Sequence, residues 1–129
     1  RPEHRDYGTM ALIFDGGVPG LEVLRDGAWY LVKPSADDAI LMLGWATHIR
    51  SNGRVSAPTH RVRDVGAELR EDTATPSAGA IPRRLSLVAF SSPPPQARLA
   101  PEGLREGETA HFRASVAGSA HAQALAPTR

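Results

Sequence analysis

A histidine and an aspartate stand two residues apart near the start of the sequence, in the stretch His4-Arg5-Asp6. In an extended segment, side chains at positions i and i+2 project from the same face. An imidazole and a carboxylate at that separation can fill two neighbouring positions around a metal ion. The same pair also suits a solvated strand end or a simple His–Asp hydrogen bond, so the pair alone leaves both interpretations open.

A third potential ligand, His60, opens a later extended stretch, "THRVRDV". The intervening chain is long enough to form several strands, so His60 can return to the same place in the fold. Two histidines and one carboxylate on one face of an octahedron leave three positions open. That arrangement is typical of non-haem Fe(II) sites that activate oxygen.

Arg84 and Ser86 are also two apart, in "RRLSLVAF", and should share a face of the last clear strand. A buried arginine is costly unless an anion meets it, and a guanidinium beside a hydroxyl suits a carboxylate. Arg83 is an alternative candidate for this role, but in a strand only Arg84 would project from the same face as Ser86. A 2-oxo acid could chelate iron through its keto oxygen and one carboxylate, with its far carboxylate on Arg84 and Ser86.

Short apolar runs must supply the strands that position these groups. They predict strands near residues 10–14, 21–24, 29–32, 39–43, 59–65 and 84–90, with an Asp-Gly hairpin turn between the second and third. The run at 39–43 is nearly continuous, which predicts a strand buried on both faces. Residues 46–54 have room for one helical turn. Many short strands without alternating helices indicate a sandwich or barrel.

Two segments break this pattern. Residues 66–82 are small, polar and punctuated by Pro and Gly, which predicts a loop or insertion. Residues 91–129 begin Ser-Ser-Pro-Pro-Pro and stay rich in Ala, Pro and Arg. We expect a short helix over 108–118 and an otherwise flexible tail.

Bulk composition limits the chemistry. The chain has 129 residues, which suggests one domain or part of one. The absence of cysteine excludes disulfides and thiolate metal sites, so histidine and carboxylate must hold any metal. A net charge of +1 gives no argument for nucleic acid, and no apolar run is long enough to span a bilayer. We therefore expect a soluble, cytoplasmic, monomeric protein with a small-molecule partner.

Several sequence motifs occur in order over residues 4–95: "HRDYGTMALIF", "VPGLEVLRDGAWYLVKP", "SNGR", "THRV" and "RRLSLVAFSSPPP". Together they resemble the C-terminal half of the 2-oxoglutarate- and Fe(II)-dependent dioxygenases of the isopenicillin N synthase-like superfamily. The resemblance implies an all-β, double-stranded β-helix (a cupin-like jelly roll). Its core would span residues 1–95, truncated at the N-terminus and followed by a loosely structured tail over 96–129.

The same resemblance assigns roles. It makes His4, Asp6 and His60 the iron ligands, and Arg84 and Ser86 the grip on the distal carboxylate of 2-oxoglutarate, with O₂ as the oxidant. The implied reaction is hydroxylation or desaturation of a small organic substrate, with decarboxylation of 2-oxoglutarate to succinate. Two alternatives stay open: an iron oxidase of the same superfamily that does not use 2-oxoglutarate, and an inactive jelly-roll fragment or binding module.

The remaining candidates have structural interpretations. Tyr7 should point away from the metal and pack, and Asp37-Asp38 should be a solvated turn. The family usually has Gly-Asp where this chain has Gly44-Trp45. We expect ordinary packing or surface positions for Trp29, Trp45, His48, His111 and His121.

Overall fold

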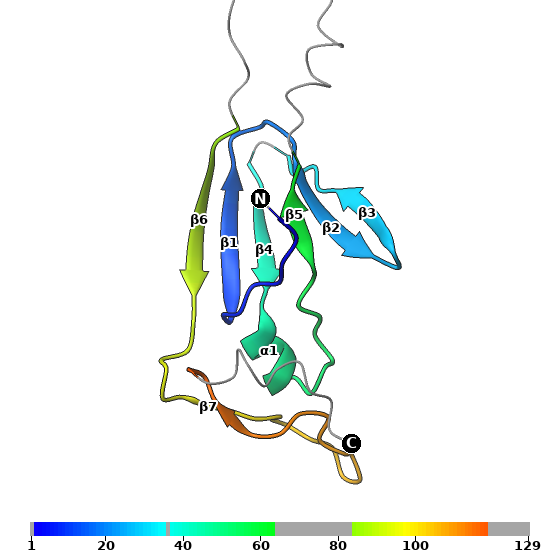
Figure 1. Ribbon diagram of the computed structural model, residues 1–129, viewed down its shortest axis with the longest axis vertical. Coiled ribbons are helices and arrows are strands. Elements are labelled where there is room, and N and C mark those ends of the chain that lie inside the picture. The colour runs from blue at the N-terminus through cyan, green and yellow to red at the C-terminus, as the bar shows by residue number, and fades with distance from the viewer. Residues whose placement is uncertain (1, 36, 64–83, 119–129) are drawn as a thin grey trace, which may run out of the picture.

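A computed structural model of the chain describes residues 2–35, 37–63 and 84–118. Within these ranges the chain is almost entirely β-structure with one short helix (Figure 1). In chain order the elements are β1 (Met10–Asp15), β2 (Leu21–Arg25), β3 (Ala28–Leu31), β4 (Ala39–Leu43), α1 (Trp45–Arg50), β5 (His60–Val62), β6 (Ser86–Ser91), β7 (Arg98–Leu99) and β8 (Ser115–Val116).

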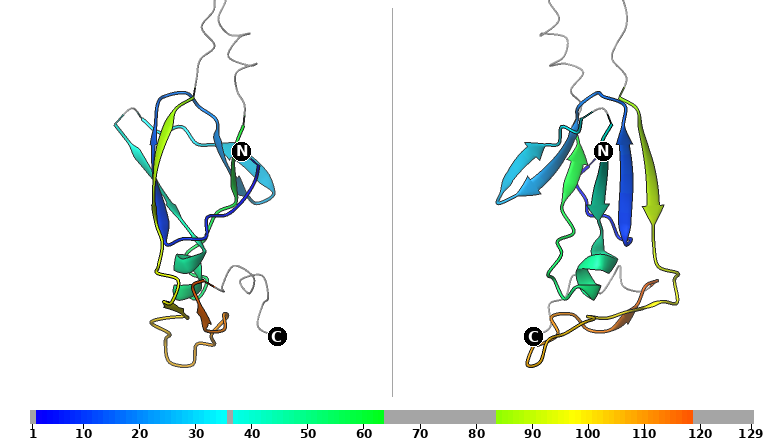
Figure 2. Two further views of the ribbon diagram at one scale, coloured as in Figure 1. Left: turned by 60° about the vertical axis from the view of Figure 1, so that its left-hand side comes forward. Right: turned by 180° about the vertical axis from the view of Figure 1, so that it is seen from behind.

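Six of these strands form two antiparallel three-stranded sheets that face each other (Figure 2, left). β1 lies between β4 and β6 in the first sheet, and β2 lies between β3 and β5 in the second. Alternate side chains of both sheets point inward and form an apolar core between them. Its buried members are Ala11, Ile13, Leu21 and Met42. The two-sheet architecture agrees with the sandwich or barrel expected from the many short strands.

The apolar runs of the sequence locate the strands to within a few residues. The strands expected at 10–14, 21–24 and 29–32 are β1, β2 and β3, and His60 heads β5 as expected. Asp26 and Gly27 turn the chain between β2 and β3 with φ angles of 52° and 79°. Positive φ at both positions is what an Asp-Gly hairpin turn requires. The helical turn expected within 46–54 is α1, which begins one residue earlier.

The prediction that the strand at 39–43 is buried on both faces is wrong. In β4, Met42 is 3 % exposed, but its neighbour Leu41 is 56 % exposed. The outer face of the whole β4–β1–β6 sheet is apolar and open within the described residues, since Phe14 and Leu87 are 46 % and 70 % exposed. The run is continuous because both faces of β4 carry apolar side chains, although only one face is covered.

The short helix expected over 108–118 is also wrong. Residues 97–118 instead form β7, β8 and connecting turns that pass beneath α1 (Figure 1). They close a second apolar core, whose buried members are Ala46, Ile49, Leu99 and Ala117. This part of the expected flexible tail is therefore packed, because Leu99 and Ala117 are each at most 2 % exposed.

Tyr7 packs against this second core, as expected. Its hydroxyl donates a hydrogen bond to the carbonyl oxygen of Ala117. Burial raises the pKa of the Tyr7 hydroxyl above its usual value. Tyr7 thus joins the segment that carries His4 and Asp6 to the C-terminal strands.

Some sequence predictions fall outside the described residues: the loop at 66–82, the rival Arg83, His121 and the end of the tail. The division into a core over 1–95 and a tail over 96–129 stays a prediction. In the described part of the chain, no helix has the length and apolar character needed to cross a membrane.

Candidate metal centre

His4 and His60 come together through a short antiparallel pairing of their backbones. The amide N–H of each residue donates to the carbonyl of the other, with N···O distances of 3.0 and 2.9 Å. The ladder between β2 and β5 places Val23 opposite His60, so the second sheet fixes the position of β5. As a result the two imidazole rings lie 4.3 Å apart, centroid to centroid.

Asp6 completes the group from the same extended segment as His4. Its Oδ1 lies 3.6 Å from His4 Nε2 and 3.7 Å from His60 Nε2. Arg5, between the two, is exposed, and its Nε–H donates to Thr59 Oγ1. One ligand atom from each of His4, Asp6 and His60 lies within 4.8 Å of the others, and the described ranges contain no other such group of His, Cys, Asp or Glu.

Backbone carbonyls orient both imidazoles. His4 Nδ1 is 2.9 Å from the carbonyl oxygen of Pro2, and His60 Nδ1 is 3.2 Å from that of Pro58. A carbonyl only accepts hydrogen bonds, so these contacts favour the tautomer with the proton on Nδ1 and a lone pair on Nε2. Ligating histidines commonly bond a carbonyl or carboxylate through their other nitrogen in this way.

The donor set fits a divalent iron ion. It offers two imidazole nitrogens and one carboxylate oxygen, the combination typical of non-haem Fe(II) sites. The Nε2–Oδ1 separations are longer than a good N–H···O hydrogen bond, so these atoms of Asp6 and the two histidines converge without bonding to one another.

The start of α1 holds the backbone of Asp6 in place. The N–H of Trp45 donates to the carbonyl of Asp6 at 2.9 Å, and the N–H of Ala46 donates to the next carbonyls along the chain. Gly44 makes this approach possible, since a Cβ there would lie 2.2 Å from the carbonyl oxygen of Gly8. Asp6 is consequently 9 % exposed despite lying near the start of the chain.

A second polar cluster contains Arg84 and Ser86. Arg84 Nη1 donates to Ser86 Oγ at 3.2 Å, so the two lie together as their shared strand parity predicted. Ser86 is two residues from Val88, which packs on the inter-sheet core, so it occupies the inner face of β6. Gly20 gives the arginine room, because a Cβ there would approach Arg84 Cδ to 3.2 Å.

Arg84 has one partner that the sequence analysis missed. Its Nη2 donates to Asp15 Oδ2 at 2.7 Å, and the side chains of Arg84 and Asp15 are 17 % and 7 % exposed. In the described residues Arg84 Nε is buried without a hydrogen-bond partner. A guanidinium with unused donors beside a hydroxyl fits a carboxylate group. Asp15 escaped notice because it begins an apparent turn, "DGG".

The other candidate residues have structural contacts. His48, in the last turn of α1, has its Nδ1 2.6 Å from the carbonyl oxygen of Val55, and His111 is exposed. Trp45 packs on the second core, and the guanidinium carbon of Arg61 lies 4.0 Å from the ring centroid of Trp29. These positions agree with the packing and surface roles expected for them.

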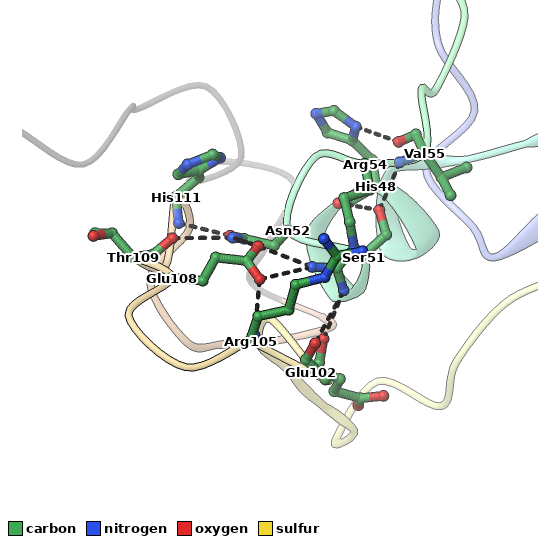
Figure 3. Close-up of polar contacts among 11 residues, drawn as sticks. His48, Ser51, Asn52, Arg54, Val55, Glu102, Arg105, Glu108, Thr109 and His111 are labelled. Atoms are coloured by element: carbon green, nitrogen blue, oxygen red, sulfur yellow. Dashed lines mark hydrogen bonds and ion pairs between the residues drawn. The ribbon is translucent and has the colours of Figure 1, made fainter.

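A buried polar network around Asn52 was also missed (Figure 3). Asn52 is 1 % exposed, with φ of 54°, and its Nδ2 donates to Glu108 Oε1 at 2.9 Å and to the carbonyl of Thr109 at 3.0 Å. Its Oδ1 accepts from the N–H of His111 at 2.7 Å. Asn-Gly is a dipeptide typical of turns, so the sequence carries a local signal at this position. The partners of Asn52 in the C-terminal segment could not be predicted from the sequence.

The family model of the 2OG-Fe(II) oxygenase superfamily matches residues 1–93. The chain belongs to this superfamily. Among curated relatives, this superfamily member is 34 % identical over 107 residues to a naringenin,2-oxoglutarate 3-dioxygenase of Hordeum vulgare, a match that covers 81 % of the chain and 25 % of the relative. It is 33 % identical to leucoanthocyanidin dioxygenase 1 of Oryza sativa subsp. japonica, with the same coverage.

Solved structures bear out the fold. The superfamily member matches the rice dioxygenase for auxin oxidation with a TM-score of 0.74 and 22 % identity, over 96 % of this chain and 39 % of that one. The two facing sheets are thus the jelly roll expected from the sequence motifs. The chain spans about a quarter of the length of the curated relatives it matches.

Proposed function

We propose that the protein is a non-haem, iron(II)- and 2-oxoglutarate-dependent oxygenase that oxidises a small organic substrate. The observation that carries this proposal is the convergence of ligand atoms from His4, Asp6 and His60 within 4.8 Å. Membership of the superfamily, whose name specifies the metal and the co-substrate, supports the choice of iron over other divalent metals.

In this proposal each residue has a defined task. His4 and His60 bind iron through Nε2, and Asp6 supplies one carboxylate oxygen. Arg84 and Ser86 bind the distal carboxylate of 2-oxoglutarate through guanidinium N–H groups and a hydroxyl. Bound iron(II) and 2-oxoglutarate supply the oxidising chemistry, in which O₂ is consumed and 2-oxoglutarate is decarboxylated to succinate.

The chain contributes positioning and proton placement. The carbonyls of Pro2 and Pro58 hold the imidazole protons on Nδ1, which keeps Nε2 available to a metal. Val23, opposite His60, packs on the inter-sheet core, so one side of the site is apolar. An apolar wall excludes water and strengthens the electrostatic grip on iron and carboxylate.

The relatives support a small organic substrate. One of those matched is named for naringenin and another for leucoanthocyanidin. We infer that this protein likewise oxidises a C–H bond of a small molecule, by hydroxylation or desaturation.

The test separates metal binding from turnover. Anaerobic titration with Fe(II), followed by 2-oxoglutarate, should give saturable binding of both to the wild-type protein. Admitting O₂ should then produce succinate. Asp6→Ala should lose iron binding, whereas Asp38→Ala, a carboxylate in an exposed turn, should keep it.

Other outcomes would redirect the proposal. Iron binding with O₂ consumption but no succinate would indicate an oxidase that does not use 2-oxoglutarate. Failure to bind iron at micromolar concentration would contradict the enzyme assignment and leave a jelly-roll binding module.

A further inference from the structure

Asp15 faces the proposed carboxylate clamp from the neighbouring strand. It is the last residue of β1, and its Cα partner across the ladder is Ser86. Paired residues in an antiparallel sheet project from the same face, so the aspartate, the serine and Arg84 occupy one patch of the inner surface. The sheet thus places a carboxylate inside a site that is proposed to bind a carboxylate.

Both oxygens of this aspartate are engaged. Oδ1 accepts a hydrogen bond from the N–H of Gly17 at 2.9 Å, and Oδ2 accepts from Arg84 Nη2 at 2.7 Å. The first contact belongs to the turn that follows β1, so the carboxylate is tied to the backbone. Its side chain is only 7 % exposed, which leaves little water to screen its charge.

The pairing changes the charge that an incoming ligand meets. Arg84 alone would offer a buried positive charge, but the arginine and Asp15 together are formally neutral. A ligand carboxylate that binds the guanidinium must approach a second, fixed carboxylate, and like charges in a poorly solvated site repel strongly.

We propose that Asp15 is the resident counter-ion of Arg84: it holds the guanidinium in position when no ligand is bound and lowers the affinity of the clamp for dicarboxylates. This inference rests on the clamp role proposed for Arg84 and Ser86. It adds a residue that sets how tightly the co-substrate binds.

Glutarate is a suitable probe, because it has two carboxylates and no keto group, so its binding does not require a metal. Urea unfolding midpoints of the metal-free protein, measured against glutarate concentration, report binding to the folded state. For Asp15→Asn we expect a half-saturating glutarate concentration at least about tenfold lower than for wild type. If Asp15→Asn is unfolded in plain buffer, the same affinity can be measured as the glutarate concentration that refolds half of the protein.

Controls separate this effect from folding and net charge. Asp26→Asn removes one carboxylate that is 86 % exposed and should leave glutarate binding unchanged. Asp15→Glu keeps the charge and should keep the weak affinity. In Asp15→Asn/Arg84→Met the gain in glutarate affinity should disappear.

The two hypotheses fail differently. If glutarate stabilises the wild-type protein through Arg84 but Asp15→Asn binds it no more tightly, the counter-ion role is wrong and the clamp stands. If no variant shows stabilisation that depends on Arg84, the clamp itself is wrong and the inference falls with it.

Discussion

Two polar clusters in this molecule differ in where their polar atoms point. The side chain of Asn52 binds the Glu108 carboxylate and the backbone of Thr109 and His111 at distances of 2.7 to 3.0 Å (Figure 3). These bonds tie the turn that follows α1 to the segment between β7 and β8. In the His4–Asp6–His60 group the imidazoles are bonded to carbonyls through Nδ1, while Nε2 and the carboxylate meet at 3.6 and 3.7 Å.

The difference is the one expected between a structural cluster and a site that binds an ion. A buried group of polar atoms that satisfies itself stabilises the fold and has no need of a further partner. In the other cluster, carbonyls bind the Nδ1 atoms, while the Nε2 atoms and the carboxylate converge at distances too long for hydrogen bonds. Such an arrangement can accept an ion between the converging atoms. We therefore expect substitutions around Asn52 to change stability and substitutions in the His4–Asp6–His60 group to change metal binding.

The largest effect should follow from His60→Ala. Removing one imidazole leaves two ligands, so we expect Fe(II) affinity to fall by about 100-fold or more. Succinate formation should be lost with it. The matched control is His48→Ala, which should keep iron binding. His48 lies on α1, and its Nδ1 contacts the carbonyl oxygen of Val55. Equal iron affinity in both variants would contradict the ligand role of His60.

Arg84→Met should weaken 2-oxoglutarate binding by about 2–5 kcal/mol, because the ligand carboxylate loses a desolvated charged partner. Titration calorimetry of the iron-loaded or manganese-loaded protein would measure this. Metal affinity should be unchanged. Arg61→Met removes a less buried arginine, which is paired with Glu22, and should leave 2-oxoglutarate binding at the wild-type level.

Asn52→Gly should act on stability alone. Glycine keeps the positive φ of this position, so the variant isolates the loss of three buried hydrogen bonds. We expect a loss of about 2–4 kcal/mol in the free energy of unfolding. Asp26→Gly, at an exposed turn with φ of 52°, is the control and should change stability little. A loss of iron affinity in folded Asn52→Gly would contradict the separation of the two clusters.

The smallest expected effect is on how the stability of the Glu108→Gln variant depends on pH. The N–H of Arg105, the amide of Asn52 and the charge of Arg54 together hold the pKa of Glu108 below its usual 4.5. A depressed carboxyl pKa stabilises the folded state above the unfolded pKa, and this stabilisation is lost as the pH falls through the folded pKa. The stability difference between wild type and Glu108→Gln should therefore be constant near neutral pH and shrink below about pH 4.5. A constant difference down to low pH would contradict this role.

Much of the fold follows from local sequence pattern. The apolar runs predicted the positions of β1, β2 and β3, because strand alternation and an Asp-Gly turn are local signals. They could not show that Leu41 is exposed, since burial depends on what covers a face. The helix expected over 108–118 failed for a similar reason: packing of Leu99 and Ala117 against α1 outweighs the weak local preference of that segment.

The sequence by itself determined which residues are candidates for the chemistry. The spacing of His4 and Asp6, the shared strand face of Arg84 and Ser86, and the strand opened by His60 are all patterns along the chain. Only the tertiary structure decided that the three ligand atoms lie within 4.8 Å, that Asp15 pairs with Arg84, and that Asn52 binds Glu108. These contacts join residues far apart along the chain. Their geometry is set by strand register and by packing between sheets, which no local stretch of sequence encodes.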